Sequence, residues 1–538
     1  GNDKNTSTGS QACTMRYEDE YPDVTRVTGF QLAADAKKIN PDVKVSLLYW
    51  CAPGWVGTDW NNIYKWLKNT TLAAYREYGY MIDIISPGVN EQKDDPNWIK
   101  QFNNWVETDT EGMLSSDDSV SGFRDGEAEL FHQIQVLMSD EVGIASCGPQ
   151  MTSDEELRNA VDIVGYHYNT DDDSAGSFKR LAEEFDKEIW NSEAQATFGS
   201  TADRPNNNMV DNADPGTGIG GNGSPLEMAN TVIKGFVNSR RTHFVYQPTF
   251  GAFYEGTQYN YKDVMAARDP WSGYVNYDGA LSVMQHFSKF AVTGWEYDTP
   301  DENVPSASKS EATGTNPVNG RNGGDNYITL ASPDKKDFSV VICNDSGKTK
   351  EFSIRPRDLD LAEGMQLKVW ETRAAEDGQL YNENYVKHIG NLSAAEDGSY
   401  TLTVKPWSIV TVTTLDMEGM EEELSIPAAT EDGRYVLDTD ETGKTQKTED
   451  TYLYVDDYNY ADMGNVMTYE DGQIVESDQS FIESRGGKDG FYPLYTQDTN
   501  GTFEVVMDET GNGALEMTGQ AGGGWRLSLD ELQSKRRL

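Results

Sequence analysis

Residues 80–94 read YMIDIISPGVNEQKD, an apolar stretch that ends in the pair Asn90 and Glu91. The stretch predicts a buried strand over 80–88, because short apolar runs bounded by Gly and Pro are typical of strands covered on both faces. Five more such strands are predicted, at 43–50, 141–148, 161–168, 187–193 and 243–251. Helices are predicted between them, at 59–78, 125–139, 154–160, 175–185 and 225–240. This alternation indicates an α/β fold with a parallel sheet, and we expect a (β/α)8 barrel, the TIM barrel.

The strand count predicts an incomplete barrel. A closed barrel of this type has eight strands, and six units that begin near residue 43 leave two βα units unaccounted for. We therefore predict that 1–295 is a TIM-barrel catalytic domain whose first two strands lie upstream of Gly1. Because missing strands expose a sheet edge, we expect the chain expressed alone to be unstable or inactive.

The rest of the chain has the pattern of antiparallel sheets. Segments such as DFSVVICN (337–344) and SYTLTV (399–404) are short strands between Gly, Asp and Pro, and they predict a β-sandwich domain at 296–428. The polar segment 299–325 predicts an exposed loop or linker. An acidic stretch then opens 429–538, which is short for a jelly-roll and predicts a partial third domain.

The composition excludes several classes of partner. With 90 acidic against 44 basic residues, the formal charge of −46 disfavours nucleic acids and anionic membranes. No run of about 18 apolar residues predicts a membrane span, and residues 1–15 lack the basic and apolar segments of an export signal. The four cysteines are far apart, which predicts neither a zinc site nor a disulfide framework.

Two glutamates follow predicted barrel strands. Glu91 follows the strand at 80–88, and Glu193 ends the strand KEIWNSE at 187–193. Barrel enzymes keep their chemistry at the carboxyl ends of the strands, and retaining glycosidases use two carboxyl groups about 5 to 5.5 Å apart. The pair therefore predicts a nucleophile and an acid/base, although an Asn–Glu dipeptide alone is more often part of an ordinary loop.

Aromatic side chains gather at the same predicted strand ends, where their rings can stack on a sugar. Each ring alone is more often part of a core, and His167 can equally bind a hydroxyl, bind a catalytic carboxylate or be structural. The residues are Trp50, Trp55, Trp60, His167, Tyr168, Trp190 and Trp271.

Five stretches carry a family resemblance: LYWCAPGWVG (48–57), VNE (89–91), VDIVGYHY (161–168), EIWNSEA (188–194) and RDPWSGYVNYDGALSVMQHFSKFAVTGWEY (268–297). In order and spacing they resemble glycoside hydrolase family 59 of clan A, the galactosylceramidase family. The resemblance implies a TIM barrel, a β-sandwich and a lectin-like jelly-roll, of which 429–538 resembles only the beginning.

The resemblance also implies roles for single residues. Glu91 is similar to the family's proton donor, Asn90 to the amide that contacts the sugar 2-hydroxyl, and Glu193 to the nucleophile. The implied galactose pocket takes Ser10, Trp50, Trp271 and Arg355 as well, with Arg355 coming from the sandwich. A structural calcium site in the third section is implied at Asp457 and Asn459, whose alternative is two turn residues; catalysis needs no cofactor.

We therefore expect a retaining exo-β-galactosidase that binds a β-galactoside and is exported to the cell exterior, the periplasm, the cell surface or a lysosome. Val89 stands where the family has Trp, and Ser10 and Gln11 replace the family's Thr and Glu. These departures leave open a ceramide, glycan or other aglycone. An endo-acting galactanase or other clan A β-glycosidase is one alternative, and a non-catalytic galactoside-binding protein is another.

Overall fold

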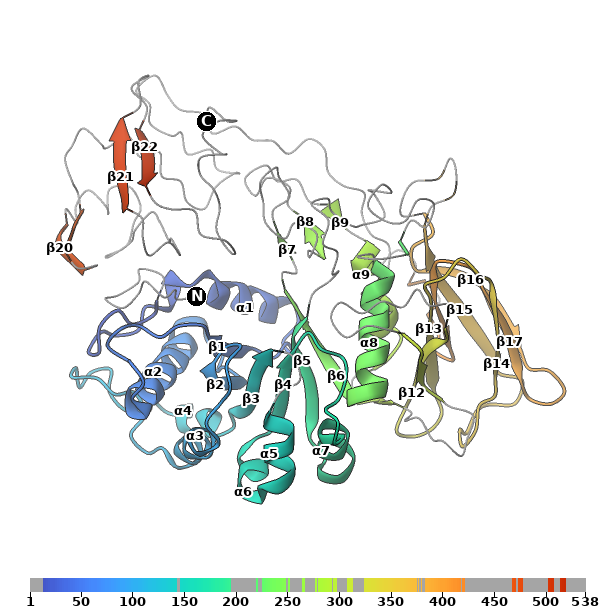
Figure 1. Cartoon of the computed structure of the whole chain (residues 1–538), viewed down its shortest axis with the longest axis horizontal. Coiled ribbons are helices and arrows are strands. Elements are labelled where there is room, and N and C mark those ends of the chain that lie inside the picture. The colour runs from blue at the N-terminus through green and yellow to red at the C-terminus, as the bar shows by residue number, and fades with distance from the viewer. Residues whose placement is uncertain are drawn as a thin grey trace. The chain divides into compact units, whose positions relative to one another are not determined.

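The structure is a computed structural model of the whole chain (Figure 1). It describes residues 13–142, 146–194, 219–220, 225–247, 250–251, 264–266, 276–277, 279–292, 294–297, 307–312, 324–374, 376, 379, 383–417, 419–420, 467–470, 473–477, 502–507 and 513–518. The described residues divide into two compact units: the first contains 13–141, 146–165 and the strands from residue 467 onward, and the second contains residue 142 and the described residues from 166 to 420.

A six-stranded sheet carries the predicted alternation of strands and helices. Its strand order is β1–β2–β3–β4–β5–β6, and β1 with β2, β2 with β3, and β5 with β6 pair in parallel. The strands are β1 (Ser46–Tyr49), β2 (Ile84–Val89), β3 (Gln135–Val142), β4 (Ile163–His167), β5 (Glu188–Ala194) and β6 (Arg241–Tyr246). Sequential order with intervening helices is the arrangement of a (β/α) barrel sheet, which confirms the predicted fold class.

Three of the helices begin at an aspartate cap. Asp59, Asp95 and Asp154 accept hydrogen bonds from the first-turn N–H groups of α2, α3 and α6, which fixes where each helix begins. The helices are η2 (Val24–Arg26), α1 (Thr28–Ile39), α2 (Trp60–Tyr78), α3 (Pro96–Thr108), α4 (Glu127–Phe131), α5 (Cys147–Ser153), α6 (Glu155–Ala160), α7 (Ser177–Phe185), α8 (Pro225–Ser239) and α9 (Gly279–Ser288).

The third strand lies earlier than the sequence pattern predicts. The predicted strand at 141–148 is wrong, because β3 is Gln135–Val142 and α5 begins at Cys147; the helix predicted at 125–139 ends at Phe131. Val136, Leu137 and Met138 are all buried, as in a strand covered on both faces, and such a run also fits a helix. Helices α1 and α3 were not predicted.

In the second unit an antiparallel sheet is covered on both faces. Its order is β10–β12–β13–β18–β15–β16, with β11 paired to β12, and β14 pairs with β17 in a separate two-stranded sheet. Val340 and Ile342 of β13 pack into a core with Leu402 of β17, while Val341 and Cys343 point the other way into a core with residues of α8 and α9. Figure 1 shows both helices beside this sheet.

The strands of this unit confirm the predicted β-sandwich, and the domain boundaries stay a prediction. The strands that follow β6 in this unit are β7 (Phe250–Gly251), β8 (Met265–Ala266), β9 (Asn276–Tyr277), β10 (Glu296–Tyr297), β11 (Lys309–Ser310), β12 (Asn326–Ala331), β13 (Phe338–Asn344), β14 (Lys350–Ile354), β15 (Gln366–Arg373), β16 (Lys387–Ser393), β17 (Tyr400–Val404) and β18 (Ser408–Thr413). Strands β14 and β16 were not predicted.

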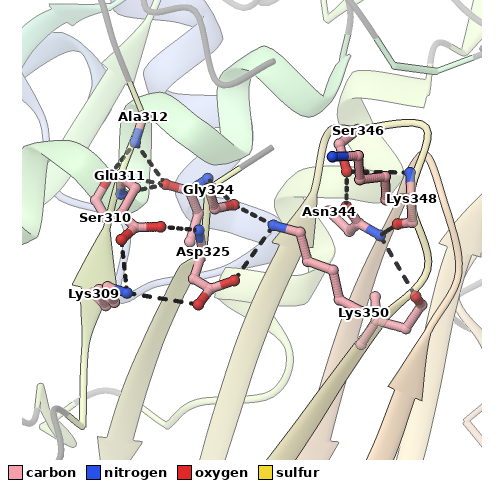
Figure 2. Close-up of polar contacts among 12 residues, drawn as sticks. Lys309, Ser310, Glu311, Ala312, Gly324, Asp325, Asn344, Ser346, Lys348 and Lys350 are labelled. Carbon is pink, nitrogen blue, oxygen red and sulfur yellow. Dashed lines mark hydrogen bonds and ion pairs between the residues drawn. The ribbon is translucent and has the colours of Figure 1, made fainter. Parts of the chain in front are cut away.

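A charged cluster ties β11 to β14 across the start of β12 (Figure 2). Lys309 Nζ lies 2.8 Å from Glu311 and 3.6 Å from Asp325, and Lys350 Nζ lies 3.5 Å from Asp325 and donates to the Gly324 carbonyl. Two cations and two carboxylates alternate, so each charge faces the opposite sign. The cluster fixes both described ends of the segment that precedes β12.

Four described strands follow the sandwich: β19 (Met467–Glu470), β20 (Gln473–Ser477), β21 (Thr502–Met507) and β22 (Gly513–Thr518). They form two antiparallel pairs, β19 with β20 and β21 with β22. Among the described helices, none combines the length and apolar character that crossing a membrane requires.

Candidate active site

The turn after β2 holds Asn90 and Glu91. The Asn90 N–H donates to the Tyr49 carbonyl at the end of β1 (2.9 Å), and the Glu91 N–H donates to the Asp140 carbonyl of β3 (2.8 Å). Glu91 has φ 61°, in the left-handed region that few residues other than glycine adopt. Its neighbours on two strands thus hold the Glu91 backbone in an uncommon conformation, as is frequent at functional sites.

Asn90 offers a buried amide to this edge of the sheet. Its side chain is 3% exposed, and neither amide atom has a hydrogen-bond partner among the described residues. A buried polar group without a partner costs free energy, on the order of 1–3 kcal/mol. A bound hydroxyl group would satisfy it.

Asp94 lies directly against the strand that carries this turn. A Cβ added at Gly88 would lie 1.6 Å from the Asp94 carboxyl oxygen Oδ1, so only glycine fits there. Burial, followed by the charges of Asp140 and Glu141, raises the pKa of Asp94 well above its usual range. Asp94 therefore lies against β2 as a buried carboxyl group whose burial favours the protonated form.

Glu193 is a buried carboxylate near the end of β5, 7% exposed. Its Oε1 accepts hydrogen bonds from the Tyr168 hydroxyl and from Gln247 Nε2, the latter at 2.9 Å. The His167 Nδ1 lies 3.8 Å from the other oxygen, Oε2. Hydrogen bonds donated to a carboxylate stabilise its negative charge and fix its direction.

Tyr168 is held in place by its backbone as well as its hydroxyl. Its φ is 58°, and its N–H lies 3.1 Å from both the Glu193 carbonyl and the Asn191 side-chain oxygen. A tyrosine in the left-handed region costs about 1–3 kcal/mol and persists only where neighbours fix it. The chain therefore bends sharply after β4 and aims this hydroxyl at Glu193.

A comparison with known protein families identifies the family of this chain. Residues 1–289 match the pattern described as Glycosyl hydrolase family 59, which is more than half of the 538 residues. The chain belongs to this family. The assignment confirms the predicted class of enzyme, a glycoside hydrolase.

Relatives within the family are distant and longer. The galactocerebrosidase of Danio rerio is 25% identical over 305 residues, covering 55% of this chain and 38% of that protein. The galactocerebrosidases of Mus musculus (24% over 430 residues) and Homo sapiens (23% over 433) cover 77% of this chain and 54% of those proteins. The chain thus spans about half, or less, of the length of these curated relatives.

Two solved structures of another glycoside hydrolase family are similar to this chain. The family 30 subfamily 8 xylanase of Clostridium acetobutylicum has a TM-score of 0.47 and 14% identity, covering 73% of this chain and 84% of that one. The family 30 endoxylanase of Clostridium papyrosolvens C71 has a TM-score of 0.45 and 12% identity, covering 71% and 82%.

The predicted site residues that the structure describes lie at four places. Glu193 and His167 lie together, and Asn90 and Glu91 share the turn after β2. Trp50 follows β1 and is 40% exposed. Arg355 follows β14 with a side chain that is 60% exposed and forms an ion pair with Asp397 (3.2 Å), so its predicted role in the pocket stays a prediction.

The remaining predicted residues, Ser10, Trp271, Asp457 and Asn459, lie outside the described residues. Two of the predicted rings have structural partners instead. The Trp55 indole donates to the Met15 carbonyl (3.1 Å), and Trp190, early in β5, donates to Glu188 (3.0 Å) and stacks on His243.

Sequence reasoning missed Gln247 and Asp94 and gave Tyr168 no more than a place among the rings. Tyr168 follows β4 directly and ends the strand predicted at 161–168, so its strand-end position was an available signal. Gln247 follows β6 directly, but the strand predicted at 243–251 placed it inside a strand and gave no such signal. Asp94 was missed because it lies in an aspartate-rich segment, where the sequence does not show which carboxyl group is buried.

Proposed function

We propose that this family 59 chain is a retaining exo-β-galactosidase that removes terminal β-galactosyl groups. The observation that carries the proposal is Glu193, a buried carboxylate at the end of a barrel strand that accepts hydrogen bonds from Tyr168 and Gln247. Hydrogen bonds from two residues fix the direction of this carboxyl group, as an attacking group requires.

In the proposed reaction Glu193 attacks the anomeric carbon while Glu91 protonates the leaving oxygen. Glu91 then takes a proton from water, the water oxygen attacks the same carbon, and galactose leaves Glu193. Both residues follow strands of one sheet, and the carboxyl ends of barrel strands share one face. The unpartnered amide of Asn90 is suited to a sugar hydroxyl next to Glu91.

The galactosyl preference rests on the relatives, which carry the name galactocerebrosidase at 23% to 25% identity. A galactolipid or another β-galactoside is therefore the proposed substrate. The proposed domains remain a barrel at 1–295, a sandwich at 296–428 and a partial lectin-like domain at 429–538. Export remains part of the proposal and rests on the family resemblance alone.

The test is hydrolysis of a chromogenic β-galactoside by the full-length protein and its variants. Glu193→Ala should abolish turnover, and added azide should restore the release of the chromogen as an α-galactosyl azide, because azide replaces the missing nucleophile on the same face. Glu91→Ala with azide should give the β-galactosyl azide, formed on the opposite face. Glu188→Ala, an exposed glutamate on the same strand, is the matched control and should retain activity.

Full turnover by Glu193→Ala would refute the assignment. Release of oligosaccharides rather than free galactose from a galactan would replace exo action with endo action. Galactoside binding without hydrolysis by the parent protein would support the non-catalytic alternative.

A further inference from the structure

An aromatic cluster joins α2 to α3 and ends in one exposed ring. Tyr64, Trp98, Phe102 and Trp105 contact one another with ring centroids 5.1 to 6.1 Å apart. Trp60 lies on Trp98 with its ring centroid 5.6 Å away and the two planes inclined by 33°. Trp98 is 5% exposed, whereas Trp60 is 37% exposed.

The exposed ring shares its support with Glu91. The Trp98 indole N–H donates to the Pro87 carbonyl (3.0 Å), and Pro87 lies in β2, whose end carries Asn90 and Glu91. Trp60 is the first residue of α2, and helices that follow barrel strands begin at the carboxyl-end face. Trp60 is thus fixed, through Trp98, to the segment that holds the proposed acid/base.

Its position on this segment tells which part of a substrate it can meet. The acid/base of a retaining glycosidase protonates the oxygen of the leaving group, so groups attached to its turn lie on the leaving-group side. The nucleophile Glu193 belongs instead to the galactosyl side. A single exposed apolar side chain is common and needs no explanation by itself. An indole that packs on Trp98, which is hydrogen-bonded to the strand before Glu91, offers a supported ring platform.

We propose that Trp60 is the platform that binds a sugar ring in the leaving group, so that the substrate is a galactoside whose aglycone begins with a sugar. The proposal rests on the proposed function and adds the chemical class of the aglycone. An indole face stacks on the C–H face of a sugar, and Trp98 beneath it keeps the indole from turning away. Flexible alkyl chains have no flat face to match such a ring.

The test compares two substrates of the full-length protein, the disaccharide β-galactosyl-(1→4)-galactose and β-galactosyl fluoride. Both carry the same galactosyl group, and the fluoride has no ring in its leaving group. In Trp60→Ala the ratio of kcat/KM for the disaccharide to kcat/KM for the fluoride should fall about 5- to 20-fold, the loss expected for one aromatic contact and its buried area. Trp60→Tyr keeps a ring and should recover most of the ratio.

Trp105→Ala is the control for a merely structural role. Trp105 belongs to the same cluster, so its loss should lower the melting temperature and leave the substrate ratio as in the parent. An unchanged ratio in Trp60→Ala overturns the proposal. Octyl β-galactoside is a third substrate: a loss as large as that for the disaccharide would show an apolar-chain surface and also overturn it.

Failure of the proposed function is a separate outcome. If the parent hydrolyses neither the disaccharide nor the fluoride, the galactosidase assignment fails while the platform is still testable by calorimetry. Binding of the disaccharide to the parent should then weaken about 5- to 20-fold in Trp60→Ala, by the same aromatic contact. Equal binding by both proteins would overturn the platform.

Discussion

The hydroxyl of Tyr168 is the most direct way to test how Glu193 is held. Tyr168→Phe removes one oxygen atom and with it one of two hydrogen bonds to Glu193 Oε1, leaving Gln247 as the described donor. Hydrogen bonds to charged groups contribute about 1.5–3 kcal/mol. Since about 1.4 kcal/mol is tenfold in rate, kcat/KM for a β-galactoside should fall about 10- to 100-fold.

The physical reason is orientation as well as charge. With one donor, the carboxylate can rotate about its last bond and leave the line of attack, and small misplacements at reacting atoms cost large factors in rate. The backbone of Tyr168 does not need its hydroxyl, because its N–H keeps the contacts to Glu193 and Asn191. The loss should therefore appear in kcat with little change in melting temperature.

The assay is steady-state hydrolysis of a chromogenic β-galactoside by the full-length protein, with a melting curve for each variant. Tyr400→Phe is the matched control, because it removes a buried tyrosine hydroxyl that donates to the Met365 carbonyl (2.9 Å) in the sandwich. It should lower stability slightly and leave kcat/KM as in the parent. If Tyr168→Phe kept kcat/KM within twofold of the parent, the hydrogen bond would have no part in catalysis.

Two further predictions concern buried charges in the first unit. The folded-state pKa of Asp94 is raised, so its protonated form contributes stability that is full below about pH 4, the unfolded pKa, and is lost as pH rises. The melting temperature of Asp94→Asn relative to the parent should therefore increase from pH 4 to 8. A constant difference between the two melting temperatures would contradict this prediction. Arg76→Met leaves Glu127 buried without its partner, since the pair's side chains are 3% and 1% exposed, and should cost about 3–5 kcal/mol in urea unfolding. Arg180→Met, which breaks an exposed pair with Glu184, should cost under about 1 kcal/mol, and equal losses would refute the comparison.

Much of the fold follows from apolar runs, and the misplaced third strand has a physical cause. Strands β2, β4 and β5 lie where their sequences predict them, because each is a buried run that ends next to turn residues. The segment before Val142 was assigned to a helix because consecutive buried residues such as Val136 and Leu137 fit either a strand or a helix. The sandwich strand β13 is also buried on both faces, because α8 and α9 cover one face and β17 packs against the other.

The candidate site is only partly readable in the sequence. The strand-end positions of Glu91 and Glu193 can be predicted from the sequence, because apolar runs show where each strand ends. The donors to Glu193 are Tyr168, 25 residues away, and Gln247, 54 residues away. Which strand-end residues face one another depends on strand order and on a left-handed backbone at Tyr168, and neither is a local property of the sequence.

The surroundings of the two glutamates differ in a way that matches two chemical roles. Glu193 accepts hydrogen bonds from Tyr168 and Gln247, and these two donors fix the direction of its side chain. Glu91 lies on the turn after β2, and Asp94, a buried carboxyl whose pKa is raised by burial, lies against Gly88 of that strand. The backbone of this turn is held by hydrogen bonds from the Asn90 and Glu91 N–H groups to two neighbouring strands, and an acid/base must keep its position while it meets first the leaving oxygen and then water. We therefore infer that hydrogen bonds to its side chain fix Glu193 as the nucleophile, and that a backbone hydrogen bond to β3 fixes the position of Glu91 as the acid/base.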